Sequence, residues 1–299
     1  MNELHQCVHG LNDLIKGKEH EVRLAVCCLL AGGHLLVEDL PGMGKTTLAH
    51  GLARVMGLDY QRIQFTSDLL PADIIGVSVY EKQTGSFRFH KGPVFTQLIL
   101  ADEINRASPR TQSALLEAME ERQVTVEGQT LTLPSPFFVI ATQNPAAQEG
   151  TFTLPESQLD RFLMRIQLGY PDKESELSLL KGEAGRSRMH ECQQVLSPST
   201  LKSGQLQVET VHASDHFLKY LLRVVTATRL SSDFVTGLSP RASLSLLQAS
   251  KAWALLHDRD YVIPEDLQAV FTAVAEHRLL SRGAGLSAKE LLATVDVTG

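Results

Sequence analysis

The 299-residue sequence has no cluster of basic side chains. It carries 28 Lys and Arg against 34 Asp and Glu, which gives a formal net charge of -6 at pH 7, and no run of Lys or Arg is longer than two residues. Proteins that bind the phosphate backbone of nucleic acids usually concentrate positive charge on one face. The composition therefore argues against nucleic acid as a partner, although a local basic pore is still compatible with it.

Long apolar runs are absent as well. The longest, Leu24 to Ala31, is too short to cross a bilayer, and the residues Met1-Asn2-Glu3 have neither the basic start nor the apolar core of a signal peptide. With 43% hydrophobic and 21% charged residues, the composition is that of an ordinary globular protein. We therefore expect no membrane span and a cytoplasmic location.

Cysteine is scarce. The four cysteines include no Cys-x-x-Cys pair, which is the spacing typical of redox and zinc sites. Cys27 and Cys28 are adjacent in an apolar segment and are expected to be small core residues. His5, Cys7 and His9 alternate along the chain, but in a helix Cys7 faces away from the two histidines, so a surface helix is favoured over a metal site.

What the sequence does contain is an apolar strand that leads through a glycine loop into a helix. The strand is predicted at Leu35 to Glu38, and the loop contains Gly42 and Gly44, whose lack of a Cβ lets consecutive backbone N–H groups close around a polyphosphate. Lys45 would reach the β and γ phosphates, and the Thr46 hydroxyl would ligate Mg²⁺. The predicted nucleotide-binding residues of this loop are Pro41, Gly42, Met43, Gly44, Lys45, Thr46 and Thr47.

The first position of the phosphate loop departs from the usual pattern, because Asp39 stands where glycine is common. We expect the Asp39 carboxylate to accept a backbone N–H of the loop, as Asp does in turns. The segment after the loop supports the pattern, since apolar residues at helical spacing follow Leu48 and Gly57 ends the helix. The alternative is a chance glycine turn with a lysine nearby.

Two carboxylates follow a second apolar segment, Gln97 to Ala101. A buried parallel strand that delivers acids at its carboxyl end fits the place where such sheets bind ligands. Asp102 would hold Mg²⁺ through water or Thr46, and Glu103 would orient and deprotonate the attacking water. A solvated strand end explains the two acids equally well on its own, but their pairing with the phosphate loop favours catalysis.

Three further segments have strand character. The alternation at Val77 to Phe89 and at Val124 to Leu133, each around a polar glycine turn, predicts two β-hairpins. Phe137 to Thr142 is expected to be another buried strand, which delivers Asn144 at its end. The Asn144 amide could hydrogen-bond the γ-phosphate or the attacking water, although Asn before proline is also a plain turn signal.

Two arginines complete the candidate site. Arg161, next to Asp160, could neutralise a transferring phosphoryl group, whereas an isolated Asp-Arg pair is more often a surface salt bridge. Ser239-Pro240 predicts a helix start that puts Arg241 in the first turn, where a cation is unfavourable to the helix dipole. A nearby anion would explain Arg241, and the alternative is an exposed arginine.

From Pro171 onward the pattern predicts helices only, with a polar, glycine-containing segment at 181–194 that we expect to be a mobile linker. A helix is expected to run from Ser239 to Leu256. The predicted core positions of that helix are Leu244, Leu247 and Trp253.

Together these motifs resemble the MoxR family of AAA+ ATPases over nearly the whole chain. The matching segments are Pro41 to Thr47 (Walker A), 65–71 and 100–107 (around Walker B), 141–145 (sensor 1), 154–162 (arginine finger) and 239–242 (sensor 2). The resemblance implies an α/β fold, with an AAA+ P-loop core of parallel strands in the order 5-1-4-3-2 and β-hairpin inserts at 1–170, and a small all-α lid domain at 171–299. Ile15 and Gly17 are added to the predicted nucleotide-binding residues.

The function that this resemblance implies is Mg²⁺-dependent ATP hydrolysis that drives chaperone-like remodelling by a ring, usually a homo-hexamer. The implied catalytic residues are Glu103, Asn144, Arg161 and Arg241, and the implied metal ligands are Thr46 and Asp102. A separate chain with a von Willebrand factor A domain would be the partner. The rival reading is a nucleic-acid motor similar to the McrB-type restriction GTPases, which the lack of basic clusters disfavours. A nucleotide-dependent scaffold with little turnover is disfavoured by the presence of Glu103.

Overall fold

The computed structural model describes the chain except for residues 1–2, 84, 145–150, 184, 283–285 and 298–299. At its centre lies a five-stranded sheet in the order β2-β5-β8-β1-β9, in which all neighbours are parallel. The strands are β1 (Leu35–Glu38), β2 (Tyr60–Gln64), β5 (Leu98–Asp102), β8 (Phe138–Gln143) and β9 (Met164–Ile166). Numbered along the chain, they have the predicted order 5-1-4-3-2, which confirms the expected α/β core.

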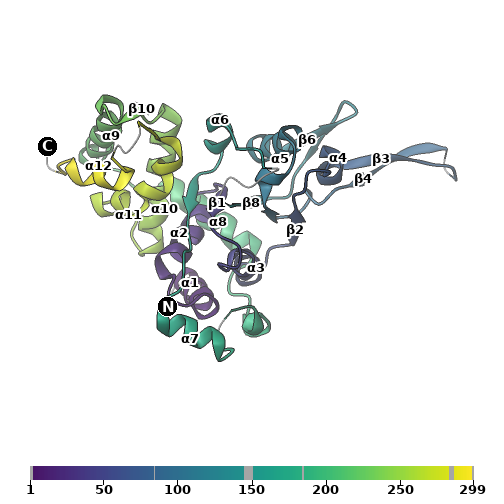
Figure 1. Cartoon of the computed structure of the whole chain (residues 1–299), viewed down its shortest axis with the longest axis horizontal. Helices are drawn as coiled ribbons and strands as arrows, with labels where there is room; N and C mark the ends of the chain where they lie inside the picture. Colours follow the sequence, from purple (N-terminus) through teal and green to yellow (C-terminus); the bar gives the residue numbers. More distant parts are fainter. Residues whose placement is uncertain (1–2, 84, 145–150, 184, 283–285, 298–299) are drawn as a thin grey trace.

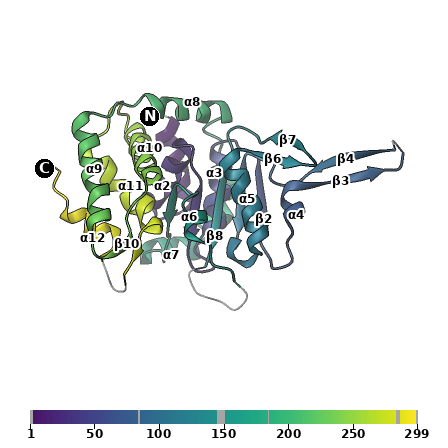
Figure 2. The same ribbon diagram turned by 90° about the horizontal axis from the view of Figure 1, so that it is seen from above.

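Helices cover both faces of the sheet (Figure 2). One face packs against α1 (Glu3–Leu14), α2 (Glu19–Leu30) and α3 (Lys45–Val55), and the other against α5 (Pro109–Glu121). Side chains alternate between these two layers, so Leu35 and Val37 join the first cluster and Leu36 joins the second. Both faces of β1, β5 and β8 are buried, and these strands are mostly apolar, as the sequence predicted, whereas the edge strand β2 is half-exposed and carries polar side chains.

Two hairpins project at the end of the molecule opposite the C-terminal helices (Figure 1). The longer arm is β3 (Gly76–Glu81) with β4 (Ser86–Lys91), which follows the short helix α4 (Pro71–Ile75), and the shorter is β6 (Gln123–Val126) with β7 (Gln129–Thr132). They touch where the Ser78 hydroxyl donates to a Glu127 carboxylate oxygen, 3.0 Å away. Both predicted hairpins are confirmed, although Thr84 in the first turn lies outside the described residues.

The C-terminal part is mainly helical. Its helices are α6 (Glu156–Leu159), α7 (Lys173–Leu180), α8 (Pro198–Thr210), α9 (Asp215–Leu230), α10 (Pro240–Leu256), α11 (Pro264–Ala275) and α12 (Ala288–Thr294). Serines cap four of these helices, since the side chains of Ser197, Ser214, Ser239 and Ser287 each accept a backbone N–H three residues later. The helix α10 packs against α11 and also against α2, so the hydrophobic cluster on the α1–α3 side of the sheet continues into the C-terminal helices.

Two details of the predicted C-terminal pattern are wrong. The expectation of helices only misses an antiparallel ribbon of β10 (Phe234–Thr236) and β11 (Leu280–Ser281), whose strands are too short to show an alternation in the sequence. The segment expected to be a mobile linker is instead anchored: it forms a 3-10 turn at Gly185–Glu191, and the Arg54 guanidinium donates to the Cys192 carbonyl at 2.7 Å.

The predicted core of α10 is also partly wrong. Leu244 is 69% exposed, whereas Ala242, Leu246 and Trp253 are buried. Two residues turn a helix by about 200°, so Leu244 points away from the face that Ala242 and Leu246 share. The expected role holds for Trp253, and Leu247 lies partly buried at the edge of the core.

Membrane-spanning helices, metal-binding clusters and the cysteines were examined in the part of the chain that the structure describes. Within it, no helix is long and apolar enough to cross a membrane, and no three metal-binding side chains gather into a site. Cys27 and Cys28 are fully buried, as predicted. Cys7 is buried while His5 and His9 are exposed, which confirms that the three side chains do not share a face.

Candidate functional site

The glycine loop between β1 and α3 leaves open space where a polyphosphate would lie. Gly42 and Gly44 have φ angles of +86° and +92°, which favour glycine, and apart from the adjacent backbone no atom lies within 4 Å of the place that a Cβ would take at either residue. Lys45, the first residue of α3, brings the positive end of the helix and its own ammonium group to this space. The residues therefore fit a bound nucleotide phosphate.

Asp39 fixes the start of this loop. Its side chain is 7% exposed, and one carboxylate oxygen accepts the N–H of Leu40 at 2.9 Å. The other oxygen accepts the N–H of Gly169 at 2.7 Å, from the segment that follows β9. The expected contact with a loop N–H is confirmed, and the same carboxylate also ties the loop to the chain that leads into α7.

Lys45 and Asn144 lie together. The Lys45 ammonium donates to the Asp39 carbonyl at 2.5 Å and to the Asn144 side-chain oxygen at 3.2 Å. Burial lowers the pKa of Lys45, an effect opposed by the nearby carboxylates of Asp39, Asp102 and Glu103. The structure thus brings the predicted sensor amide to the lysine that is predicted to bind phosphate, while Pro145 of the same motif lies outside the described residues.

Asp102 ends the neighbouring strand β5 and is held from two sides. One oxygen accepts the Thr142 hydroxyl at 2.6 Å, and the other accepts two N–H groups of Arg62 at 2.6 and 3.1 Å. Only 8% of the residue is exposed. A carboxylate and the Thr46 hydroxyl are oxygen donors that suit Mg²⁺. The sequence missed Arg62, which reaches Asp102 only because β2 and β5 are neighbours in the sheet.

Glu103 follows in a left-handed conformation, with φ of 56°. Its backbone N–H donates to the Thr142 hydroxyl at 2.9 Å, and its carboxylate accepts Gln64 at 2.9 Å and Arg106 at 3.0 Å. Strand β2 therefore supplies a partner to each acid: Arg62 binds Asp102, and Gln64 binds Glu103. Neither partner was singled out from the sequence.

A substitution at Thr142 tests whether the two acids depend on this hydroxyl. Thr142→Val keeps the shape but removes both hydrogen bonds, so we expect about tenfold to thirtyfold slower ATP turnover, from about 1 kcal/mol for each buried bond. Thr142→Ser keeps the hydroxyl and should stay within about twofold of wild type, because the same bonds can form. Phosphate release at saturating ATP measures the effect, and equal rates for the two variants would contradict it.

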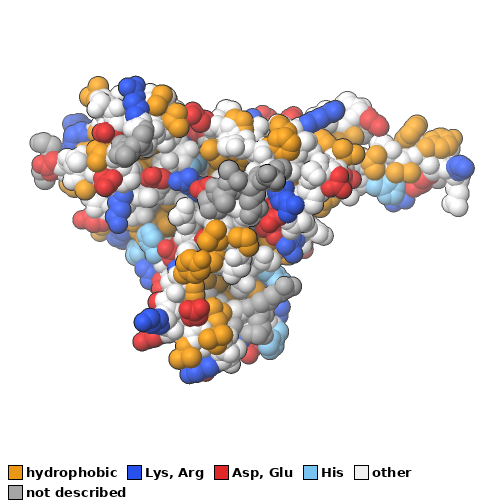
Figure 3. All heavy atoms as spheres, in the orientation of Figure 1, with side chains coloured by type: hydrophobic (Ala, Val, Ile, Leu, Met, Phe, Trp, Pro, Cys, Tyr) orange, Lys and Arg blue, Asp and Glu red, His pale blue; other side chains and the backbone are white. Residues whose placement is uncertain are grey.

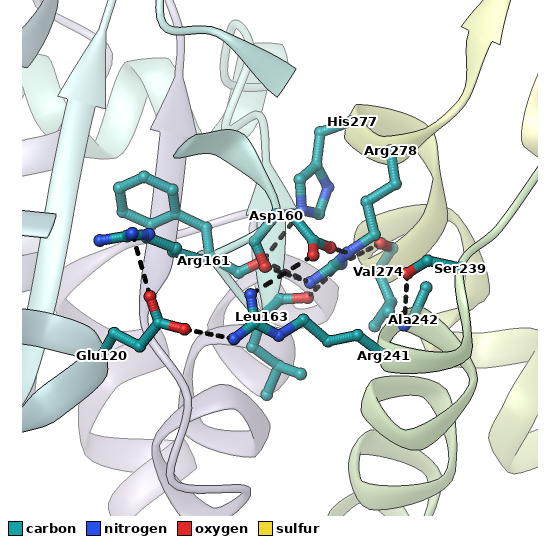
Figure 4. Close-up of polar contacts among 11 residues, drawn as sticks. Glu120, Asp160, Arg161, Leu163, Ser239, Arg241, Ala242, Val274, His277 and Arg278 are labelled. Atoms are coloured by element: carbon teal, nitrogen blue, oxygen red, sulfur yellow. Dashed lines mark hydrogen bonds and ion pairs between the residues drawn. The ribbon is translucent and has the colours of Figure 1, made fainter. Parts of the chain in front are cut away.

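Arg161 and Arg241 lie together at a different place. Glu120, near the end of α5, accepts Arg161 at 3.0 Å on one carboxylate oxygen and Arg241 at 2.5 Å on the other (Figure 4). Asp160 lies 3.6 Å from Arg241. The anion expected near the first turn of α10 is thus present, in the form of Glu120 and Asp160.

This pair of arginines lies at the amino-terminal end of the parallel strands, whereas the phosphate loop lies at their carboxyl end. The two arginines share a shallow pocket with Gly33 and His34, which precede β1, whereas Lys45 follows the carboxyl end of that strand. The four residues of β1 alone span about 13 Å. Within one chain the structure therefore does not bring the two predicted catalytic arginines to the predicted nucleotide.

Ile15 and Gly17 lie beside the start of the core. Ile15 is buried and its N–H donates to the Leu11 carbonyl, which extends the end of α1. Gly17 has a φ of +71°, and a Cβ there would lie 2.5 Å from the Ser175 hydroxyl. Their contact with a nucleotide stays a prediction, as it does for Pro41, Met43 and Thr47 of the loop.

The chain matches known families over most of its length. Residues 34–164 match the family described as "ATPase family associated with various cellular activities (AAA)", and residues 226–294 match an AAA lid domain. The chain is 40% identical over 293 residues to Chaperone MoxR1 of Mycobacterium tuberculosis, which covers 94% of this chain and 76% of that protein. The chain belongs to the MoxR family of AAA+ ATPases.

Other relatives of this MoxR-family chain agree. It is 46% identical over 277 residues to the uncharacterized protein YeaC of Bacillus subtilis, with 93% of this chain and 87% of that protein covered. A crystal structure of a protein from Cytophaga hutchinsonii assigned as an ATPase has a TM-score of 0.89 and 38% identity, over 98% of this chain and 93% of that one. The MoxR-family chain is an ATPase with a AAA+ core and lid.

Proposed function

We propose that the protein hydrolyses Mg²⁺-ATP in a ring of identical subunits and uses the cycle to remodel protein targets. The proposal of a ring is supported by the separation of Arg161 and Arg241 from the phosphate loop of their own chain. An arginine finger must reach the transferring phosphate. A neighbouring subunit that presents its open phosphate loop to these arginines would meet that requirement, and a ring of six is the expected closure.

The residues at the carboxyl end of the parallel strands have different roles in ATP hydrolysis. Lys45 binds the β and γ phosphates, and Thr46 and Asp102 would hold Mg²⁺, which neutralises phosphate charge when bound. Arg62 and Thr142 fix the Asp102 carboxylate. Glu103 takes the proton of the attacking water, and Asn144, already in contact with Lys45, orients that water or the γ-phosphate.

Sedimentation velocity tests the ring. We expect a small species without nucleotide and a larger one with ATP when Glu103→Gln blocks hydrolysis, together with an ATPase rate per subunit that rises with protein concentration. A species that stays monomeric at saturating ATP and hydrolyses at the full rate would overturn the shared site.

The long hairpin supports protein as the target. Hydrophobic side chains gather along this hairpin (Figure 3). Tyr80 and Phe87 form its aromatic face: they are 53% and 70% exposed, and their ring centroids lie 5.4 Å apart in an edge-on arrangement. On its other face Arg88 pairs with Glu81 at 3.3 Å, so that cation is already balanced. The hairpin also carries Lys82 and Lys91, so protein as the target is supported by the exposed aromatic pair, which suits an apolar polypeptide surface.

Variants of the aromatic face test this assignment. Tyr80→Ser with Phe87→Ser should leave basal ATP hydrolysis within about twofold of wild type, because neither residue touches the catalytic groups, and should weaken capture of an unfolded model protein by about tenfold, as loss of two binding anchors does. Arg88→Gln, on the opposite face, serves as the matched control. Unchanged capture by the double variant would rule out this face.

The nucleic-acid motor remains the second candidate, because the insert hairpin and the acidic motif also fit it. We expect no binding of duplex DNA or RNA at physiological salt and no stimulation of ATP hydrolysis. A protein that contacts several phosphates shows affinity that falls by about 0.9 log units per contact for each tenfold rise in salt. Tight, salt-sensitive anisotropy signals that vanish when Gln83 to Ser86 are deleted would favour the motor.

The partner and the compartment complete the proposal. A separate chain with a von Willebrand factor A domain is the proposed partner, on the strength of the family resemblance. A cytoplasmic location, where ATP is abundant, is proposed with it. Co-purification with such a chain from the source cells is the corresponding test.

A further inference from the structure

The Glu120 carboxylate lies between two arginines that come from distant parts of the chain (Figure 4). Arg161 approaches from the turn before β9 and Arg241 from the first turn of α10, and each binds a different oxygen of Glu120. The exposed fractions of the side chains are 33% for Glu120, 29% for Arg161 and 52% for Arg241. The cluster is therefore open to water and to another subunit.

The charges in this cluster are coupled. The hydrogen bond from Arg241 is the main reason why the pKa of Glu120 is lowered. Burial, the next largest effect, raises this pKa, and the charges of Arg161 and Arg241 lower it further. The same bond raises the pKa of Arg241. Glu120 is thus ionised, and its charge is the one that balances the two arginines.

Asp160, the second anion of the cluster, binds mainly to another arginine, Arg278. Asp160 accepts the guanidinium of Arg278 at 2.7 Å, and Arg278 is only 5% exposed and also donates to the Phe162 carbonyl at 2.8 Å. The contact from Asp160 to Arg241 is longer, at 3.6 Å. A charged ligand that enters the cluster would therefore compete with Glu120 and leave the Asp160–Arg278 pair in place.

We propose that Glu120 is the counter-ion that Arg161 and Arg241 keep within their own chain, and that the triphosphate of a neighbouring subunit displaces it when the ring forms. The inference rests on the proposed function, in which these arginines act on the neighbour's nucleotide. A triphosphate carries several negative charges against one on Glu120, and it is the stronger partner for two guanidinium groups. Glu120 thereby holds both side chains in one place before assembly and makes assembly depend on bound ATP.

This role differs from that of a plain ion pair between α5 and α10. A pair that only stabilises the fold would change the melting temperature when it is removed, and it would leave assembly unchanged or weaken it. A displaced counter-ion does the opposite, because its removal frees the two arginines for the neighbour. The sign of the change in assembly therefore separates the two roles.

The test compares Glu120→Gln with Glu121→Gln in the full chain. Glu121 is the adjacent residue, is exposed and makes neither ion pair. We expect Glu120→Gln to lower the protein concentration for half-maximal ATPase activity by about threefold to tenfold, the effect of removing two partly exposed ion pairs. The rate per subunit at saturating protein should stay within about twofold of wild type, and Glu121→Gln should behave as wild type.

Sedimentation with ATP gives a readout independent of activity. Glu120→Gln should assemble at lower concentration than wild type, and Glu120→Ala should move in the same direction if the glutamine variant folds poorly. In an Arg161→Ala, Arg241→Ala background the Glu120 substitution should have no effect on assembly, since there is nothing left to release.

Three outcomes would overturn the inference: unchanged or weaker assembly of Glu120→Gln, an equal shift in Glu121→Gln, or a shift that persists without the two arginines. Failure of the proposed function looks different. In that case Arg161→Ala and Arg241→Ala would each turn over ATP as fast as wild type, whatever the Glu120 variants do.

Discussion

Lys45→Ala should abolish ATP binding, whereas Glu103→Gln should bind ATP as wild type and lose hydrolysis. Lys45 is 7% exposed, and its ammonium faces the glycine loop from between the Asp39 carbonyl and the Asn144 side chain. Its removal takes away the point charge nearest to the predicted phosphates, and no other described lysine lies in this loop. Glu103→Gln keeps an acceptor oxygen for Gln64 and Arg106 but cannot take a proton.

The expected size of the second effect follows from general-base catalysis. Proton removal by a positioned base contributes about 10² to 10⁴ in rate, so Glu103→Gln should lose at least about a hundredfold in turnover. Nucleotide affinity is measured by titration with a fluorescent ATP analogue, and turnover by phosphate release. Lys219→Ala, which removes an exposed lysine of α9 away from the glycine loop, controls for loss of a positive charge.

The two variants test separate assignments. If Glu103→Gln hydrolysed ATP within a few-fold of wild type, another group would be the base, and Glu103 would only shape the end of β5. If Lys45→Ala bound ATP normally, the glycine loop would not be the phosphate site. A melting temperature close to that of wild type is required for both variants, so that a loss of activity reports on chemistry.

The carboxyl edge of the sheet could be predicted from the sequence because each of its parts is local. The loop that ends at Lys45 follows the apolar strand β1, and Asp102 and Glu103 stand at the end of the apolar strand β5. Parallel strands put their carboxyl ends at one side of the sheet. Even the contact of Asp39 with the loop follows from the turn chemistry of a single residue. No knowledge of which strands are neighbours was needed.

The partners of the acids could not be predicted in this way. Arg62 and Gln64 reach Asp102 and Glu103 because β2 pairs with β5 in register, so that Arg62 lies opposite Leu100 and Gln64 opposite Asp102. The resemblance supplies the order of strands but not this register. In the sequence the two side chains are ordinary polar residues of a half-exposed edge strand.

The start of α8 carries a sequence signal of its own. Ser197-Pro198 repeats the Ser-Pro start found before α5 and α10, and the Ser197 side chain accepts the Thr200 N–H in the same way. By contrast, the meeting of Arg161 and Arg241 on Glu120 joins residues far apart in sequence, from α5, the turn before β9 and α10. Only the packed fold reveals it.

The position of Arg161 and Arg241, away from the phosphate loop, leads to the second prediction with a large effect. Arg161→Ala should bind ATP yet lose about a thousandfold or more in turnover, the scale of arginine fingers. ATP binding should persist, because Arg161 lies at the amino end of β9 and the binding loop follows the carboxyl end of β1. Arg241→Ala should behave similarly, since the same carboxylate of Glu120 holds both side chains.

Mixing two inactive variants distinguishes action within a chain from action between chains. Lys45→Ala lacks a working pocket but keeps its arginines, and Arg161→Ala lacks the arginine but keeps its pocket. If each arginine serves the neighbour, a random equal mixture restores both parts at about a quarter of the interfaces of a ring. Activity should then rise well above that of either variant alone.

The mixture needs proof that mixed rings form, which two affinity tags on the two variants provide. A control mixture of Lys45→Ala with Glu103→Gln should stay inactive, because both defects lie in the same pocket and no interface then has a complete pocket. If tagged mixed rings of Lys45→Ala and Arg161→Ala also stayed inactive, the arginine would not serve a neighbouring pocket. The distance between the two edges of the sheet would then require a rearrangement within one chain that brings Arg161 to its own phosphate loop.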